Sequence, residues 1–271
     1  MVRRLAVTAV LLLTTASWLV GCSLGDTASL SPAKHQETVE LTVSVAASLR
    51  EAMTEIKAIY EKESGVRIHL NFGSSSSLAR QNEQGAPVDV FKSASEEETN
   101  RLIDYGLMER EKTTHLLTNR LVLITSEPYA AEINQLADLV RNRVEKVAIG
   151  IPETVPAGKY AREALRKSEL WQPLQHKLVF AKDVRQVLAF VETQNVAAGL
   201  VYASDAQAST GVVVVEELDP ELHDPIIYPA GVIAASDHVE VAEEFWRYLQ
   251  SSEAAKVFES YGFQTWKQGD S

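Results

Sequence analysis

The sequence predicts an α/β protein of two lobes, each a mostly parallel β-sheet flanked by helices. From residue 41 onward, short runs of β-branched and apolar residues alternate with amphipathic segments of helical period. Such alternation of strand and helix is typical of sheets whose faces are covered by helices. About 230 residues follow residue 39, which is enough chain for two hydrophobic cores of ordinary domain size.

The first part of the chain alternates three predicted strands with three predicted helices. Apolar or alternating residues bounded by turn residues mark the strands, and apolar residues at helical spacing mark the helices. The strands are predicted at 41–46, 66–72 and 88–91, and the helices at 49–64, from 78 onward and at 96–105. Gly65 and Gly106 end two of these helices. Ligands of such sheets bind beyond the carboxyl ends of strands, at the junctions that lead into the helices.

The second part of the chain continues this pattern. Strands are predicted at 121–125, 146–151, 177–180, 199–202, 212–215 and 228–235, and helices at 159–167, 184–193 and, as one or two, within 241–261. Residues 152–158 are predicted as a loop because each of its prolines pushes the preceding residue out of helical geometry. The strand at Tyr228 most economically rejoins the first sheet. We therefore expect lobe 1 to comprise 40–119 and 228–271 and lobe 2 to comprise 120–227, with a hinge of two crossing segments.

A serine-rich segment marks the second of the strand-to-helix junctions. Residues 74–77 are all serine, and they stand where the strand 66–72 gives way to the helix at Leu78. Backbone N–H groups in the first turn of a helix lack an intrahelical partner, and the aligned peptide dipoles leave partial positive charge there. The segment therefore predicts an anion site without a fixed positive charge. A plain N-cap and turn would use the same residues.

The N-terminus indicates an exported lipoprotein. Arg3 and Arg4 precede an apolar run over 5–20, which is shorter than the roughly 20 residues of a spanning helix and fits a signal peptide. The run ends in Leu-Val-Gly-Cys22, which resembles a bacterial lipobox. We expect 1–21 to be removed, Cys22 to be acylated and 22–39 to form a flexible tether at the extracytoplasmic face of the cell membrane. An ordinary secretory signal or an uncleaved anchor is the alternative.

Composition excludes several classes of function. The formal net charge is −11 and lysines and arginines do not cluster, so a nucleic-acid partner is not expected. Cys22 is the only cysteine, and the six histidines show no close pairing, which argues against a bound metal ion. A serine hydrolase is the alternative of another class, but the chain has no Gly-x-Ser-x-Gly motif, and its only Ser-x-x-Lys, Ser31 to Lys34, lies in the tether. We expect neither catalysis nor a cofactor.

Six short motifs together resemble the periplasmic molybdate-binding proteins of bacterial ABC transporters. They are Val45-Ala-Ala-Ser48-Leu, Ser74-Ser-Ser-Ser-Leu-Ala-Arg80-Gln, Gly85-Ala-Pro-Val-Asp89-Val-Phe, Val155-Pro-Ala-Gly158, Asp183-Val184-Arg185 and Gly199-Leu-Val-Tyr202-Ala-Ser204-Asp205-Ala. With the closing Tyr261-Gly262-Phe263 they span nearly the whole mature chain. The resemblance implies a type II periplasmic-binding-protein fold with two lobes and an interlobe cleft.

The resemblance also implies a set of oxyanion ligands. Ser48 and Ser75 would offer hydroxyl and backbone N–H groups, Ala157 and Val184 backbone N–H groups, and Tyr202 its hydroxyl. Two of these residues belong to the predicted lobe 1 and three to lobe 2, so a ligand would join the lobes. Each residue also has a plainer interpretation as a cap, loop, core or sheet residue.

The implied function is capture of molybdate or tungstate by a monomer, which delivers it to an ABC transporter permease. A pocket made only of donors would reject phosphate, because the proton of that anion needs an acceptor. The same fold bound to another oxyanion, such as sulfate or phosphate, is the main alternative, since a fold alone does not fix the solute.

Four charged residues near these motifs carry expectations of their own. Asp183 and Arg185 are expected to cap and orient rather than to bind the ligand, and Arg80 to brace a carboxylate such as Asp89. Lys92 departs from the family pattern, which has an apolar residue there. We expect its side chain to reach solvent, although in the cleft it would add a positive charge.

Overall fold

The computed structural model describes residues 38–267. The predicted signal peptide, the lipidation site Cys22 and almost all of the tether lie outside the described residues. Residues Thr38–Ser271 form one compact unit. Within the described part of this unit, no helix combines the length and the apolar character needed to cross a membrane.

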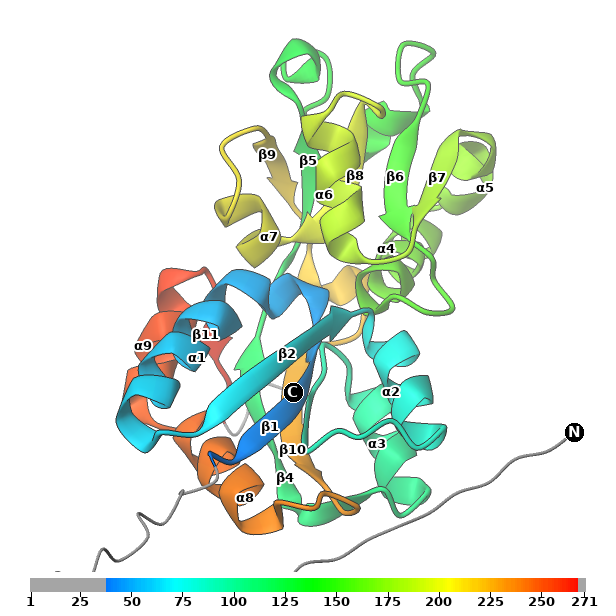
Figure 1. Ribbon diagram of the computed structural model, residues 1–271. Coiled ribbons are helices and arrows are strands. Elements are labelled where there is room, and N and C mark those ends of the chain that lie inside the picture. Colours follow the sequence, from blue (N-terminus) through cyan, green and yellow to red (C-terminus); the bar gives the residue numbers. More distant parts are fainter. Residues whose placement is uncertain (1–37, 268–271) are drawn as a thin grey trace, which may run out of the picture. The chain divides into compact units, whose positions relative to one another are not determined.

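Two mixed β-sheets form the framework of this unit, which confirms the predicted two-lobed α/β class (Figure 1). In spatial order the first sheet comprises β11 (Gln264–Thr265), β4 (Met108–Thr118), β10 (Ile227–Ile233), β3 (Val90–Lys92), β1 (Glu40–Ala46) and β2 (Arg67–Gly73). The second comprises β7 (Leu178–Ala181), β6 (Val147–Gly150), β8 (Ala198–Tyr202), β5 (Leu121–Thr125) and β9 (Val213–Glu217). We call each sheet with its helices a lobe.

Each sheet is parallel on one side and antiparallel on the other. Strand β1 pairs in parallel with β2 and β3, whereas β10 runs antiparallel to β3 and β4. In the second sheet β6 pairs in parallel with β7 and β8, and β5 runs antiparallel to β8 and β9. The antiparallel sides contain the strands through which the chain leaves and re-enters the first sheet. It leaves between β4 and β5 through Asn119 and Arg120 and returns between β9 and β10 through 218–226.

Helices cover both faces of the first sheet. α1 (Arg50–Ser64), α8 (Val239–Tyr248) and α9 (Ser252–Ser260) lie on one face, and α2 (Ser75–Glu83) and α3 (Glu96–Asp104) on the other (Figure 1). The second sheet is packed by α4 (Pro156–Lys167) and α6 (Val184–Glu192), with the short α5 (Trp171–Leu174) and α7 (Ala203–Gln207) beside them. The remaining elements are short 3-10 helices: η1 (Ala47–Leu49), η2 (Glu127–Tyr129), η3 (Leu136–Val140), η4 (Gln175–Lys177) and η5 (Pro220–Leu222).

Several strand-to-helix junctions follow the carboxyl ends of parallel strands, and four of them position predicted site residues. β1 leads into η1 and α1, β2 into α2, β6 into α4, and β7 into α6. At one of them a glycine permits unusually close packing, because a Cβ atom on Gly158 in the first turn of α4 would lie 2.1 Å from the carbonyl oxygen of Gly150 at the end of β6. Only glycine lets this helix start so near its strand.

The structure corrects two of the predicted elements. Strand β4 was not predicted, because its sequence is charged and polar along much of its length and takes its conformation from pairing with β10 and β11. Residues 156–158, predicted as loop, form the first turn of α4, with Pro156 at the first helical position. Proline is favoured there because its missing N–H would have had no helical partner.

The expected exposure of Lys92 is wrong. Its side chain is fully buried at the end of β3, in the middle of the first sheet, and its Nζ atom donates to the carbonyl oxygen of Tyr228 at 3.0 Å. The same Nζ atom lies 5.7 Å from the centre of the Tyr228 ring and 5.7 Å from that of Phe258. Burial lowers the pKa of Lys92 well below its ordinary value.

The substitution Lys92→Met is expected to raise the free energy of unfolding at pH 7 by about 1–3 kcal/mol, because it removes the cost of burying an ammonium group. The unfolded lysine keeps its proton up to about pH 10.5 and the folded one loses it earlier, so wild-type stability rises with pH through that window. The gain from Lys92→Met should therefore shrink between pH 7 and pH 10. Urea unfolding of the wild type and of Lys92→Met at pH 7 and at pH 10 measures the gain at each pH.

Lys57→Met, at a partly exposed lysine of α1, is the matched control and should change stability little at either pH. A Lys92→Met gain that stays constant from pH 7 to pH 10 would contradict the buried-amine interpretation.

Candidate functional site

All five predicted ligand residues line one small cavity between the lobes. Ser48 and Ser75 come from the first lobe, and Ala157, Val184 and Tyr202 from the second. All five are buried. The cavity measures about 10 Å³, which is the scale of a single water molecule. In this closed arrangement the space is too small for a sugar or an amino acid.

Ser48 lies in η1, directly after the carboxyl end of β1. Its Oγ atom lies 3.1 Å from the hydroxyl oxygen of Tyr228, which belongs to β10. The geometry of this pair alone allows either hydroxyl to donate.

Ser75 is the first residue of α2, and the serine-rich segment does form the predicted strand-to-helix junction. Ser74 occupies the N-cap position without a side-chain hydrogen bond to the helix, because its Oγ bonds to that of Ser77 instead. The Oγ atom of Ser75 accepts a hydrogen bond from the backbone N–H of Ala94 at 3.0 Å. Its own hydrogen is left to be donated elsewhere. The plain N-cap interpretation of this segment thus fails for Ser74.

Ala157 and Val184 lie in the first turns of α4 and α6. Backbone N–H groups at these positions cannot bond within their helix. Asp183 is the N-cap of α6, and its Oδ1 accepts from the backbone N–H of Gln186 at 2.8 Å, as expected for a capping residue. The N-terminal ends of α2, α4 and α6 meet at the cavity, so their partial positive charges add there.

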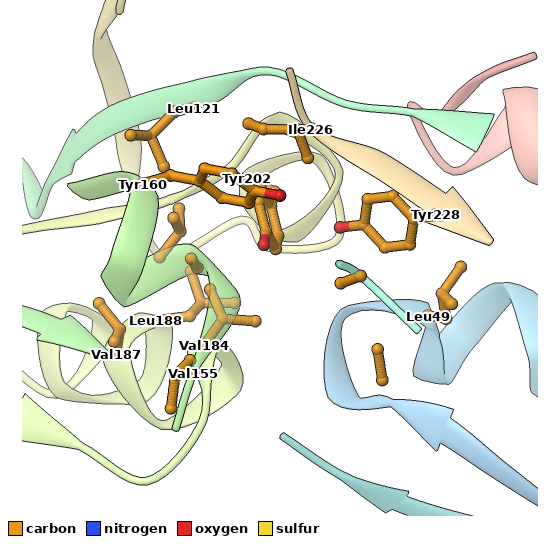
Figure 2. Close-up of a cluster of buried hydrophobic side chains, with 14 of the residues drawn as sticks. Leu49, Leu121, Val155, Tyr160, Val184, Val187, Leu188, Tyr202, Ile226 and Tyr228 are labelled. Atoms are coloured by element: carbon orange, nitrogen blue, oxygen red, sulfur yellow. The ribbon is translucent and has the colours of Figure 1, made fainter. Parts of the chain in front are cut away.

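Tyr202 ends β8 and faces Tyr228 across the lobe boundary, with ring centres 5.7 Å apart (Figure 2). The hydroxyl oxygen of Tyr202 is buried without a well-formed hydrogen bond among the described residues, although it interacts with the side chain of Tyr228. Burial, with the neighbouring Tyr228 phenol second, raises the pKa of Tyr202 well above its ordinary value. Its hydroxyl therefore keeps its hydrogen at neutral pH and is available as a donor.

No cationic side chain lines the cavity in the described part of the chain, and the only charged residue that does is Asp183. The carboxylate of Asp183 is engaged by the α6 backbone. The neighbouring Arg185 is directed to two carboxylates: its Nη2 lies 2.6 Å from Oε1 of Glu51 and its Nη1 3.5 Å from Oδ1 of Asp205. The cavity consequently presents neutral donors.

Arg185 also connects the lobes. Glu51 belongs to α1 of the first lobe, whereas Arg185 and Asp205 belong to the second. Burial raises the pKa of Asp205 to about 7, although the positive charge of Arg185 opposes the shift. A second ion pair between the lobes joins Lys159 of α4 to Glu97 of α3, at 2.9 Å. Arg185 thus pairs with a carboxylate of each lobe and does not line the cavity.

The expected contact between Arg80 and Asp89 is absent. The Nε atom of Arg80 donates to the carbonyl oxygen of Ser76 at 3.4 Å. Asp89 instead accepts from the backbone N–H of Thr42 and from the hydroxyl of Ser236. Lys92 does not line the cavity either.

Sequence reasoning missed three polar groups that surround the ligand candidates: the backbone N–H of Ala94 and the side chains of Asn119 and Tyr228. The sequence marks Tyr228 only as the start of a returning strand, and Asn119 only as the last residue of the first segment of lobe 1. Their separation from Ser48 in sequence, 180 residues for Tyr228, leaves no local pattern that would have linked them.

The described residues contain no arrangement for hydrolysis or metal binding. Neither Ser48 nor Ser75 hydrogen-bonds to a histidine. No group of histidine, cysteine, aspartate and glutamate side chains in residues 38–267 is placed to hold a metal ion.

Comparison with known proteins agrees with this geometry. Residues 41–264 match the family described as bacterial extracellular solute-binding protein. YvgL of Bacillus subtilis strain 168, provisionally named an ABC transporter substrate-binding lipoprotein, is 43% identical over 90% of this chain and 92% of its own length. The molybdate-binding protein ModA of Escherichia coli K12 is 39% identical over 83% of this chain and 88% of its own.

A solved structure of a substrate-binding domain is also similar to this chain. The substrate-binding domain of a protein from Clostridium difficile, provisionally named a molybdenum ABC transporter, superposes with a TM-score of 0.66 at 42% identity and covers 85% of this chain and all of that domain. The members of this family bind solutes for transporters and are not enzymes. The family match over nearly the whole described chain, together with these relatives, shows that the chain belongs to the bacterial extracellular solute-binding proteins.

Proposed function

We propose that this protein captures molybdate or tungstate in the cavity between its lobes and delivers the anion to an ABC transporter permease. The observation that carries the proposal is the convergence of neutral donors on one small, buried space: the hydroxyls of Ser48, Ser75 and Tyr202 and the first-turn N–H groups at Ala157 and Val184. Relatives named for molybdate support the choice of anion. One chain supplies both halves of the cavity, so a monomer is sufficient.

Neutral donors are enough to hold a dianion. Each hydrogen bond to an ionised acceptor contributes about 1.5–3 kcal/mol, and these donors are already oriented by their helices. The overall negative charge of the protein does not prevent binding, because charges beyond about 8 Å are largely screened by salt. The site therefore needs no counter-charge.

The same donors favour anions without a proton. Phosphate near neutral pH carries an O–H group, and the one carboxylate that lines the cavity, Asp183, already accepts from the backbone of α6. A phosphate O–H left unpaired there would cost about 1–3 kcal/mol. Molybdate, tungstate and sulfate carry none, and sulfate is the smaller ion. The relatives' names favour molybdate over sulfate.

The ion pairs between the lobes would stabilise the ligand-bound arrangement. The pairs Arg185–Glu51 and Lys159–Glu97 each join the two lobes across the boundary on which the cavity lies. Because every lining residue predicted to bind is buried, the lobes must separate for an anion to enter. Separation breaks these pairs, and closure over the anion restores them.

We further propose that the protein is anchored at the extracytoplasmic face of the cell membrane through lipid on Cys22. The lipoprotein name of the Bacillus relative supports this anchor. A tether over 22–39 would give the folded unit freedom to meet its permease.

Removal of the Ser75 hydroxyl tests the site. Ser75→Ala is expected to weaken molybdate and tungstate about 10- to 150-fold, because one donor to an ionised ligand is lost. Isothermal titration of residues 23–271 with molybdate, tungstate, sulfate and phosphate measures the effect. Ser77→Ala, at an exposed serine of the same segment, should bind as the wild type does. Wild-type protein that prefers phosphate or sulfate to molybdate would refute the choice of anion.

Loss of an ion pair between the lobes should weaken anion binding although the predicted binding residues are unchanged. Glu51→Gln is expected to raise the dissociation constant of molybdate about two- to fivefold, because a partly exposed pair contributes up to about 1 kcal/mol and, in the proposed mechanism, is made only when the lobes are closed. Glu83→Gln removes a pair of the same 2.6 Å length within the first lobe, and affinity should not change. Equal effects of the two substitutions would argue against a role in closure.

The anchor is tested in a bacterial host. Cys22→Ser is expected to move the protein from the membrane fraction to the soluble extracytoplasmic fraction and to abolish incorporation of labelled fatty acid. Ser29→Ala, in the predicted tether, serves as the control and should change neither the membrane location nor the incorporation of fatty acid. Labelling that persists in Cys22→Ser would rule out the cysteine as the acylation site, since the chain has no other.

A further inference from the structure

A buried chain of hydrogen bonds leads from the first interlobe crossing to the cavity. Asn119 stands between β4 and β5, and its Nδ2 atom donates to Oγ of Ser204 at 2.8 Å and to the hydroxyl oxygen of Tyr228 at 3.4 Å. Tyr228 in turn lies 3.1 Å from Oγ of Ser48, which lines the cavity. All four residues are buried.

The orientation of the Asn119 amide is determined by its own backbone. The Oδ1 atom of Asn119 accepts from the backbone N–H of Arg120 at 2.9 Å. The reversed amide would set two N–H donors against each other at this point. The NH₂ group must therefore face Tyr228 and Ser204, and an amide NH₂ can only donate.

The direction of the remaining bonds follows from this orientation. Because Tyr228 accepts from Asn119, its single hydrogen is free to be donated to Ser48. Burial raises the pKa of Tyr228 well above its ordinary value, so the phenol keeps that hydrogen at neutral pH. In this direction Ser48 accepts from Tyr228 and keeps its own hydrogen for a further acceptor. The competing acceptor for the Tyr228 hydrogen is the hydroxyl of Tyr202, which also interacts with Tyr228.

Ser75 is arranged in the same way by a different partner. Its Oγ atom accepts from the backbone N–H of Ala94. A backbone N–H can only donate. The protein thus places one donor group beside each of the two predicted ligand serines, Ser48 and Ser75. Each serine retains its own hydrogen for a ligand.

We propose that Asn119 and Tyr228 are positioning residues that fix the Ser48 hydroxyl as a hydrogen-bond donor, and that this polarity lets the site discriminate against oxyanions that carry a proton. The inference rests on the proposed oxyanion site. It assigns selectivity to two residues that do not themselves bind the anion. A hydroxyl free to turn would accept the proton of hydrogenphosphate, whereas Ser48 held as a donor opposes it.

Tyr228→Phe tests this assignment, because it removes the donor to Ser48 and keeps the ring and its packing against Tyr202. Isothermal titration near pH 8 measures the dissociation constants of molybdate, sulfate and hydrogenphosphate, all present as dianions. The preference for sulfate over hydrogenphosphate, two ions of similar size, is expected to fall about 5- to 100-fold. A purely structural role would weaken all three anions together and leave this ratio unchanged.

A second variant keeps the test decisive if Tyr228→Phe does not fold. Asn119→Asp replaces the donor amide by an acceptor of the same shape, which draws the Tyr228 hydrogen away from Ser48. Its added charge repels all the dianions alike, so the same fall in the sulfate to hydrogenphosphate ratio is expected. Tyr248→Phe removes the hydroxyl of a tyrosine in α8 that does not line the cavity. It is the control and should keep the wild-type ratio.

The outcomes separate this inference from the proposed function. Wild-type protein that binds none of the oxyanions overturns the site itself. Wild-type protein that binds molybdate, with an unchanged ratio in folded Tyr228→Phe and Asn119→Asp, overturns only the role of Asn119 and Tyr228.

Discussion

The N–H groups of helix first turns are the constraint on which the rest of this structure depends. Such groups have no partner within their helix, and burying them without one costs free energy. Here α2, α4 and α6 all begin at a cavity that their own residues close. In the proposed function, a small anion would supply the missing acceptors and be stabilised by the partial positive charge of the three helix starts. The packing of α4 against the end of β6, which Gly158 permits, brings one of these helix starts into position.

The side chains around the cavity also determine which hydroxyl hydrogens remain to be donated. A serine hydroxyl can both donate and accept, so it does not by itself favour one kind of ligand. Ser75 receives a hydrogen bond from the backbone at Ala94, and Ser48 lies against Tyr228. Once a protein donor occupies the oxygen, the remaining hydrogen of the serine is directed to the ligand. The surroundings of each hydroxyl, rather than the hydroxyl itself, determine what it recognises.

Fixed charges lie close to the cavity and yet do not line it, apart from the capping Asp183. Lys92 is buried against the carbonyl oxygen of Tyr228, at a cost that is reflected in its lowered pKa. Arg185, next to the predicted ligand Val184, pairs with Glu51 and Asp205. Asp205 is buried deeply enough for its pKa to rise to about 7 despite this cation. These charges are thus engaged with protein groups, and the proposed recognition of the anion rests on neutral donors.

The sequence by itself determined the alternation of strands and helices, the position of the serine-rich junction and the membership of Ser48, Ser75, Ala157, Val184 and Tyr202 in one family pattern. Those features are local, because period, turn residues and short motifs are read within about ten to twenty residues. Only the tertiary structure decided that β4 is a strand, that Lys92 is buried, and that Asn119 and Tyr228 stand behind Ser48. Each of these depends on pairing or packing between segments that are distant in the chain, and such contacts leave no periodic signal in the residues that make them.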